Sequence, residues 1–307
     1  MTVLRVDRVA SEAEEQLSLD VYNRVWPHDQ VSLLEVHSFK ASLLDSLDVL
    51  ARIDGEVAGS AVAAIEPSRP QLVLLLLTVL AEHRRRGAGT ELWRAVSEWA
   101  RERGLERLEA VVADNDPDSL AVAQRHGFRE ERREAGVALD LRAVDAPRVD
   151  LPDGIEIVVW ADRPELARGM YEVAREAHVD IPGSEEDEVQ PFEHWLAHDM
   201  GGAGDDPAAT FVAVAGDEVV GYAKFSLTAA TPTIAHHDLT GVRRSWRGQG
   251  IARALKATQI GWAKANGYEE LRTRNEERNA PIRRLNAEFG YRPATGRVYM
   301  VGPVMSP

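Results

Sequence analysis

The stretch that decides the fold reads Val242-Arg243-Arg244-Ser245-Trp246-Arg247-Gly248-Gln249-Gly250-Ile251-Ala252-Arg253-Ala254-Leu255. It joins an apolar segment, expected to be a strand, to a segment whose apolar residues recur at helical spacing. The small residues Gly250 and Ala252 let the backbone approach a ligand and leave its N–H groups pointing outward, at the positive end of the helix dipole. The stretch therefore predicts a cradle for a diphosphate. A tight turn carrying surface arginines is the alternative.

The same arrangement occurs a second time, as His83-Arg84-Arg85-Arg86-Gly87-Ala88-Gly89-Thr90-Glu91-Leu92. Gly87 and Gly250 are 163 residues apart (250 − 87). Gly127-Phe128 and Gly290-Tyr291 are separated by the same 163 residues (290 − 127). A repeat of this period is the size of a domain, so the sequence predicts two copies of one domain.

The two motifs Arg84-x-x-Gly87-x-Gly89 and Arg247-x-x-Gly250-x-Ala252 resemble the acetyl-CoA motif of the GNAT N-acetyltransferase superfamily. The resemblance covers nearly the whole chain twice, most clearly residues 50–130 and 212–292. The second copy also has Asn275, Asn279, Ile282 and Asn286 before Gly290-Tyr291, which is similar to the tandem GNAT proteins that include mycothiol synthase.

The resemblance implies an α/β fold with a mixed sheet, in two tandem acyl-CoA N-acyltransferase domains. We expect an N-terminal domain at 1–146, degenerate in its chemistry, and a catalytic C-terminal domain at 147–307, joined through a linker at 144–154 that contains Pro147 and Pro152. The expected order in each copy is strand, helices, a hairpin, a central strand, the cradle, a helix, a strand, a short helix and a last hairpin, placed around Gly136 in the first copy.

Hydrophobic periodicity and capping signals place these elements. In the first copy, strands are expected near 3–9, 47–53, 57–65, 72–79 and 108–112, and helices from Ser11 to Arg24 and over 32–45, 89–103 and 119–126. In the second copy, strands are expected at 155–160, 210–215, 219–227 and 233–242, and helices at 162–177 and 192–198. The segments 178–188 and 200–207 are expected to be loops, the second of them beside the acceptor site.

Acetyl-CoA is the cofactor that the resemblance implies. The strand end would contact the pantetheine arm through its main chain, and the turn would hold the diphosphate. Asn279 resembles the asparagine that contacts pantetheine, although a helix N-cap explains it equally well. The residues expected to bind the cofactor are Thr240, Gly241, Val242, Arg247, Gly248, Gln249, Gly250, Ile251, Ala252, Arg253 and Asn279 in the second copy, and Val79, Arg84, Arg85, Arg86, Gly87, Ala88, Gly89 and Thr90 in the first.

The central strands of the two copies differ in chemistry. Residues 71–79 of the first copy hold nothing able to accept a proton, whereas the second copy has His236, His237 and Asp238 in its strand. Acetyl transfer to an amine needs a base whose pKa lies near working pH, and an imidazole meets this requirement. His236 stands where the family commonly has a glutamate, six residues before Val242. We therefore predict His236 as the base, Asp238 on the same strand face as its partner, and His237 facing away in a structural role.

A tyrosine that many family members place four residues before the Gly-aromatic pair is replaced here by Asn286, and by Ala123 in the first copy. The role of that tyrosine as a general acid therefore cannot be assigned to either of these positions. Solvent or another side chain could protonate the departing thiolate, or no acid is needed. Tyr291 and Tyr299 are expected in the core.

Composition narrows the function further. The net charge of −14 disfavours nucleic acid and acidic membranes as partners, and the chain has no cysteine, so disulfides and thiolate sites are excluded. The longest apolar run, 72–80, is far too short to span a membrane. No metal-ligand spacing stands out. We expect a cytoplasmic protein whose start carries no secretory signal.

The sequence predicts an acetyl-CoA-dependent N-acetyltransferase acting on a primary amine of a small molecule or peptide. Two alternatives stay open: a mycothiol synthase-type enzyme, and a non-catalytic acyl-CoA-binding protein in which both cradles are filled. The acidic segment 184–188 would suit a cationic acceptor, or it is a solvated loop. The acceptor and the oligomeric state are not predicted.

Overall fold

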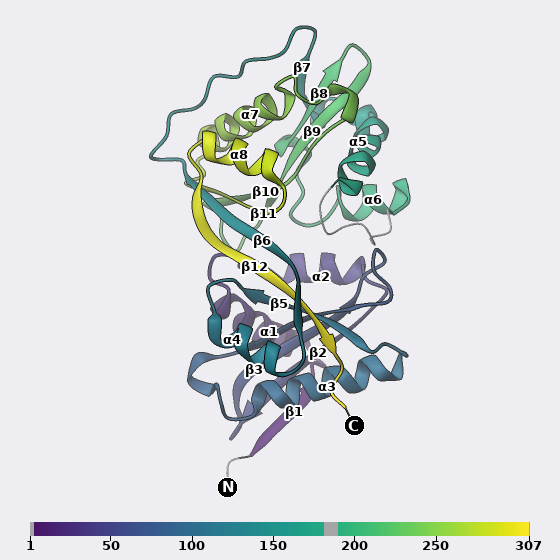
Figure 1. The fold of residues 1–307 in the computed structure, drawn as a ribbon, viewed down its shortest axis with the longest axis vertical. Coiled ribbons are helices and arrows are strands. Elements are labelled where there is room, and N and C mark those ends of the chain that lie inside the picture. Colours follow the sequence, from purple (N-terminus) through teal and green to yellow (C-terminus); the bar gives the residue numbers. More distant parts are fainter. Residues whose placement is uncertain (1–2, 181–189, 307) are drawn as a thin grey trace. The chain divides into compact units, whose positions relative to one another are not determined.

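The computed structural model describes residues 3–180 and 190–306, which form two compact units. The first unit comprises residues 1–133 and 297–307, and the second comprises residues 134–296. In each unit a mixed sheet is flanked by helices (Figure 1). The loop expected at 178–188 and the acidic segment 184–188 fall largely or wholly outside the described residues.

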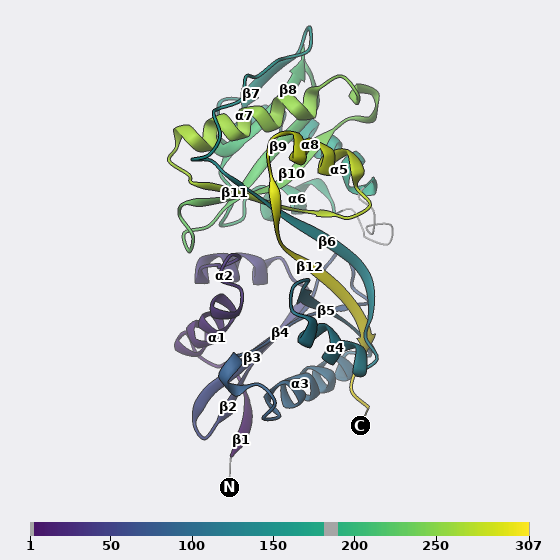
Figure 2. The ribbon, with the colours of Figure 1, turned by 60° about the vertical axis from the view of Figure 1, so that its left-hand side comes forward.

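In the first unit the sheet follows the order β1-β2-β3-β4-β5-β12. Helices α1 and α3 both pack on β2, β3 and β4, one on each face (Figure 2). The predicted inner face of α3 is confirmed, since Leu92, Val96 and Trp99 are buried in the core of this unit. The element bounds are β1 Leu4–Arg8, α1 Glu12–Val25, α2 Leu33–Ala41, β2 Asp45–Ile53, β3 Glu56–Ile65, β4 Val73–Val79, α3 Ala88–Glu102, β5 Arg107–Ala113, α4 Pro117–Arg125 and β6 Arg129–Asp140.

In the second unit the order is β6-β11-β10-β9-β8-β7. Alternate residues of β8 belong to two hydrophobic cores, one on each face of the sheet. Phe211 and Ala213 pack on the α7 side, whereas Val212 and Val214 pack on the α5 side. Figure 1 shows α7 and α5 on either side of these strands. The bounds are β7 Glu156–Val159, α5 Ala167–Val179, α6 Phe192–His198, β8 Thr210–Ala215, β9 Glu218–Leu227, β10 Ile234–Val242, α7 Ile251–Ala265, β11 Glu270–Glu276, α8 Ala280–Glu288 and β12 Arg292–Pro303.

The last strand of each copy belongs to the sheet of the other unit. Residues 134–140 of β6 pair antiparallel with β11 in the second unit. Residues 297–303 of β12 pair antiparallel with β5 in the first unit, where Val298 and Met300 are fully buried. The boundary predicted at 146/147 divides the chain between the two sequence repeats. The compact units divide it differently: the first unit includes residues 297–307 of the second repeat, and the second unit includes residues 134–146 of the first.

The hairpin expected around Gly136 is wrong. Strand β6 runs without interruption from Arg129 to Asp140. Gly136 lies in the middle of this strand, next to β12 (Figure 2). A glycine is required there because a Cβ would stand 2.1 Å from the carbonyl oxygen of Thr295 in β12. The glycine permits a close backbone approach and makes no turn.

Two predicted helices are also corrected. In the helix predicted at 162–177, one 3₁₀ turn ends at Asp162 and a second covers Pro164–Leu166, and α5 itself covers Ala167–Val179. The second helix of the first copy stops at Ala41, and Asp45 already belongs to β2. Most other elements lie within one or two residues of their predicted bounds, and the N-cap predicted at Ser11 is confirmed.

Candidate active site

Each unit opens its sheet beside its cradle. Strands β4 and β5 pair in parallel only from Val73 to Leu75, although β4 continues to Val79. Strands β10 and β11 likewise pair only from Ile234 to His236, although β10 continues to Val242. The two parallel strands therefore separate at equivalent places. In the first unit a pocket lies between the diverging ends, and we call this position in each unit the slot.

The Gly-rich turns stand at the mouth of these slots and begin α3 and α7. Gly87 and Gly250 are the N-cap residues, both left-handed, with φ of 92° and 89°. Neither helix has a side-chain cap, in contrast to α1, whose first turn is capped by Ser11. The first N–H groups of a helix have no partner within it, so these turns offer donors to an anion. A Cβ built on Gly250 meets nothing within 4 Å, which leaves room beside the backbone.

The arginine that opens each motif fixes the turn to the preceding strand. Arg247 donates from Nε to the carbonyl of Val242 at 3.0 Å, and Arg84 makes the corresponding bond to Val79 at 3.4 Å. Two residues separated by 163 positions thus perform the same structural task. In each unit this side chain links the turn to the end of the preceding strand.

Acidic residues pair with the cradle arginines in both units. In the second unit Asp180 binds Arg244 and Arg247, and Glu288 binds Arg253. In the first unit Arg84 lies 3.3 Å from Asp116. The hydrogen bond from Arg244, together with that from Arg247, lowers the pKa of Asp180 to about 2, so this carboxylate is charged at neutral pH.

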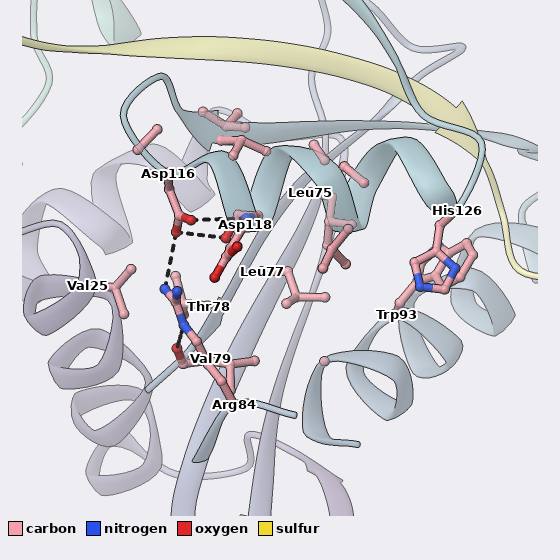
Figure 3. A pocket seen from close by; sticks show the side chains of 18 of the residues that line it. Val25, Leu75, Leu77, Thr78, Val79, Arg84, Trp93, Asp116, Asp118 and His126 are labelled. Carbon is pink, nitrogen blue, oxygen red and sulfur yellow. Dashed lines mark hydrogen bonds and ion pairs between the residues drawn. The ribbon is translucent and has the colours of Figure 1, made fainter. Parts of the chain in front are cut away.

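The slot of the first unit is a pocket of about 520 Å³. Figure 3 shows Arg84 and Asp116 joined at one end and Trp93 with His126 at the other. Leucine and valine side chains of β4 and β5 line the pocket together with these polar residues. Its lining includes Val25, Trp26, Leu75, Leu77, Val79, Gly87, Gly89, Thr90, Trp93, residues 110–113 of β5, Asn115, Asp116, Ala123, His126 and Phe128.

In the second unit His236 occupies the point where the strands part. It is opposite Ser226 of β9 and Arg272 of β11, in the last parallel pair between β10 and β11. Directly after it the register with β9 shifts by one residue between His237 and Thr240, which is a β-bulge. The first unit has no such shift between β3 and β4.

Asp238 has a partner that the sequence did not indicate. Its carboxylate lies 2.7 Å from Nζ of Lys224, which also pairs with Asp205 and donates to the carbonyl of Asp199. Desolvation raises the pKa of Asp199 and of Asp205. The charge of Lys224 keeps this group together, on the face of β9 and β10 that bears α5 and α6.

His237 lies on the opposite face, in a buried polar network. Its Nδ1 lies 2.9 Å from Oε1 of Gln259, and its Nε2 lies 2.5 Å from the hydroxyl of Tyr291. Burial, with a smaller effect from Lys256, lowers the pKa of His237 well below the ordinary value, so the imidazole is neutral. The neutral imidazole donates a hydrogen bond from Nδ1–H to the Gln259 oxygen, and its Nε2 accepts a hydrogen bond from the Tyr291 hydroxyl.

The two asparagines singled out by the sequence differ in their surroundings. Asn279 is the N-cap residue of α8, but its side chain makes no capping bond. Asn286 is 1% exposed and donates to Asn275 at 2.7 Å, while its own oxygen is buried without a partner. Tyr291 and Tyr299 are buried, as expected. Lys224, Lys256 and Gln259 were missed, because polar residues within apolar strand and helix patterns give no signal of their own.

Known proteins share this architecture. The model of the acetyltransferase (GNAT) family matches residues 12–128 and 167–291, so the chain belongs to this family. A GCN5-related N-acetyltransferase from Sphaerobacter thermophilus superposes with a TM-score of 0.78 at 23% identity, over 99% of this chain and 96% of the other. A tandem GNAT protein of the clavulanic acid biosynthesis pathway gives 0.77 at 20% identity, over 99% and 100%. The predicted tandem GNAT fold is confirmed.

No curated protein matches the chain. Among residues 3–180 and 190–306, no helix combines the length and the apolar character that crossing a membrane requires. Within the same ranges no three His, Asp or Glu side chains are grouped so that they could hold a metal ion.

Proposed function

We propose that the chain is an acetyl-CoA-dependent N-acetyltransferase that acetylates a primary amine of a small molecule or peptide, with the chemistry in the second unit. The position of His236 carries this proposal, because it places an imidazole where β10 and β11 separate. The family, the two glycine N-caps and the open space at Gly250 support acyl-CoA as the donor. Strand β4 of the first unit has only leucine, valine and threonine side chains, so it offers no comparable base.

Each part of the second unit then has a task. The N–H groups of Ile251, Ala252 and Arg253 at the start of α7 bind the diphosphate. The main chain from Leu239 to Val242 contacts the pantetheine arm. When bound, acetyl-CoA supplies an acyl group activated as a thioester. His236 removes a proton from the attacking amine, directly or through water, and Asp238 adds negative charge nearby that favours the imidazolium.

The first unit is proposed to bind acyl-CoA without chemistry. Its pocket lies between β4 and β5 beside the cradle, and Leu75, Leu77 and Val79 line it. The stoichiometry of CoA binding tests this: two molecules per chain in the wild type, and one each in Gly87→Glu and Gly250→Glu. A wild type that binds one CoA, lost in Gly250→Glu alone, would contradict the proposal for the first unit.

The catalytic proposal is tested by thiol release from acetyl-CoA across a panel of amines. His236→Ala should lower kcat by about 10²- to 10⁴-fold, the range for loss of a general base, with CoA affinity unchanged. The part of the pH dependence of kcat that arises from the His236 imidazole should disappear as well. His28→Ala, an exposed histidine of the first unit, is the matched control.

The alternatives predict other results. Full turnover in His236→Ala means that another group is the base. CoA binding without acetylation of any amine favours the acyl-CoA-binding protein. Selective use of a cysteinyl pseudo-disaccharide amine within the panel favours the mycothiol synthase-type enzyme.

A further inference from the structure

Lys256 differs from the other three lysines of the chain in its surroundings. Lys40 is paired with Glu15 and Asp48, Lys224 with Asp205 and Asp238, and Lys264 donates to the carbonyls of Leu141 and Val144. Lys256 lies in the buried face of α7 and is 1% exposed. Among the residues that the structure describes, its amino group has no hydrogen-bond or ion-pair partner and stands 4.9 Å over the ring of Tyr291.

The internal repeat gives the equivalent of this residue in the first unit. Lys256 is equivalent to Trp93 (256 − 93 = 163), which forms a wall of the pocket in the first unit. Tyr291 is likewise equivalent to Phe128, and Asn286 to Ala123, both of which line that pocket. At these three positions the second unit has Lys256, Tyr291 and Asn286 where the pocket of the first unit has Trp93, Phe128 and Ala123.

Two atoms in this polar set lack a partner. Within residues 3–180 and 190–306, the oxygen of Asn286 and Nε2 of Gln259 are buried without a hydrogen-bond partner. A buried polar group without a partner costs about 1–3 kcal/mol, so such groups mark a place where a ligand completes the bonding. For Lys256 the cost falls when the amine is neutral, and a neutral amine is a nucleophile.

We propose that Lys256 is a self-acetylation site, modified by acetyl-CoA bound in the slot of the second unit. The inference depends on the proposed binding of acetyl-CoA there. The neutral Nζ attacks the thioester carbonyl carbon, a C–N bond forms and the C–S bond breaks. The proton lost from nitrogen passes to sulfur, so the products are Nε-acetyllysine and free CoA thiol.

The protonation state of Lys256 agrees with this chemistry. Burial lowers its pKa to about 7, whereas ion pairing raises the pKa of Lys40 and of Lys224 against their own burial. The titratable groups beside Lys256 are His237 of β10 and Tyr291, which directly precedes β12, and burial keeps both neutral. Around pH 7 about half of the Lys256 side chains are therefore free amines, and the paired lysines are charged.

The test is peptide mass spectrometry of the full chain after incubation with acetyl-CoA. We expect Lys256 to be acetylated about tenfold or more faster than Lys40, Lys224 or Lys264 near pH 7.5, with a rate that levels off above about pH 8. Excess free CoA and the variant Gly250→Glu should each abolish this preference, and so should urea.

Equal modification of the four lysines, or no modification of Lys256, overturns the proposal. A preference for Lys256 that survives both free CoA and Gly250→Glu also overturns it, because reagent from bulk solvent would then be the source. Thiol release with amines, measured on the same samples, separates the two hypotheses. Amine turnover with unmodified Lys256 refutes self-acetylation alone, whereas acetylated Lys256 without amine turnover refutes the proposed transferase alone.

Discussion

Asp180 lies 2.7 Å from Arg247, the arginine that opens the cradle motif of the second unit. The same carboxylate binds Arg244, and its pKa is about 2 because these two arginines donate to it. An anion at the cradle competes with Asp180 for the same positive charge.

Replacing Asp180 should therefore strengthen CoA binding. Asp180→Asn removes the competing charge, and since exposed ion pairs are worth up to about 1 kcal/mol, we expect about two- to fivefold tighter binding at low salt. The gain should shrink as ionic strength rises. Titration calorimetry measures it, and Asp162→Asn controls for the change in net charge. Weaker binding would mean that Asp180 orients the arginines for the ligand.

Two glycines of one helix should respond in opposite directions to alanine. Gly250 has a φ of 89°, which an alanine adopts only with strain, so Gly250→Ala should lower the unfolding free energy by about 1 kcal/mol. Gly261 lies inside α7 with nothing within 4 Å of a built Cβ, so Gly261→Ala should raise it by up to about 1 kcal/mol. Urea denaturation checks both. The same sign for both changes would contradict the assigned backbone geometry.

Lys256 should make stability depend on pH above neutrality. Its pKa in the folded protein is about 7 and its ordinary value is 10.5, so between these values the unfolded chain binds one proton more than the folded protein. Stability then rises with pH across this window, by up to about 1.4 kcal/mol per unit from this group.

Lys256→Met should remove that slope. Denaturation at about pH 7, 8 and 9 measures it, below the range in which tyrosines ionise. An unchanged slope in the variant would show that Lys256 is not the group responsible.

Removing residues 297–307 should unfold the first unit, although these residues come from the second copy of the sequence. The deletion takes away the strand that pairs with β5, the buried side chains of Val298 and Met300, and the Arg297 ion pair with Asp29. We expect loss of the slow-exchanging amides of β5 and of CoA binding at the first cradle. Removing only Ser306 and Pro307 is the control. A first unit that stays folded after the long deletion would contradict the strand exchange.

Much of the fold could be predicted from local patterns. Gly87 and Gly250 mark the start of α3 and α7 because a left-handed N-cap favours glycine. The spacing of Leu92, Val96 and Trp99 gave the buried face of a helix. Repetition at 163 residues predicted two copies of one domain, and the family match agrees with it.

The sequence by itself thus determined the element order, the tandem repeat and the cradles, because these depend on neighbours along the chain. Tertiary structure alone decided the partners: that β12 completes the sheet of the first unit, that Lys224 binds Asp238, and that the Lys256 amine lies over the ring of Tyr291. Gly136 shows the difference. The local sequence predicted a turn there, whereas the close approach of the Thr295 backbone requires a glycine within a strand. Contacts between residues far apart in sequence follow from packing, and no local pattern encodes them.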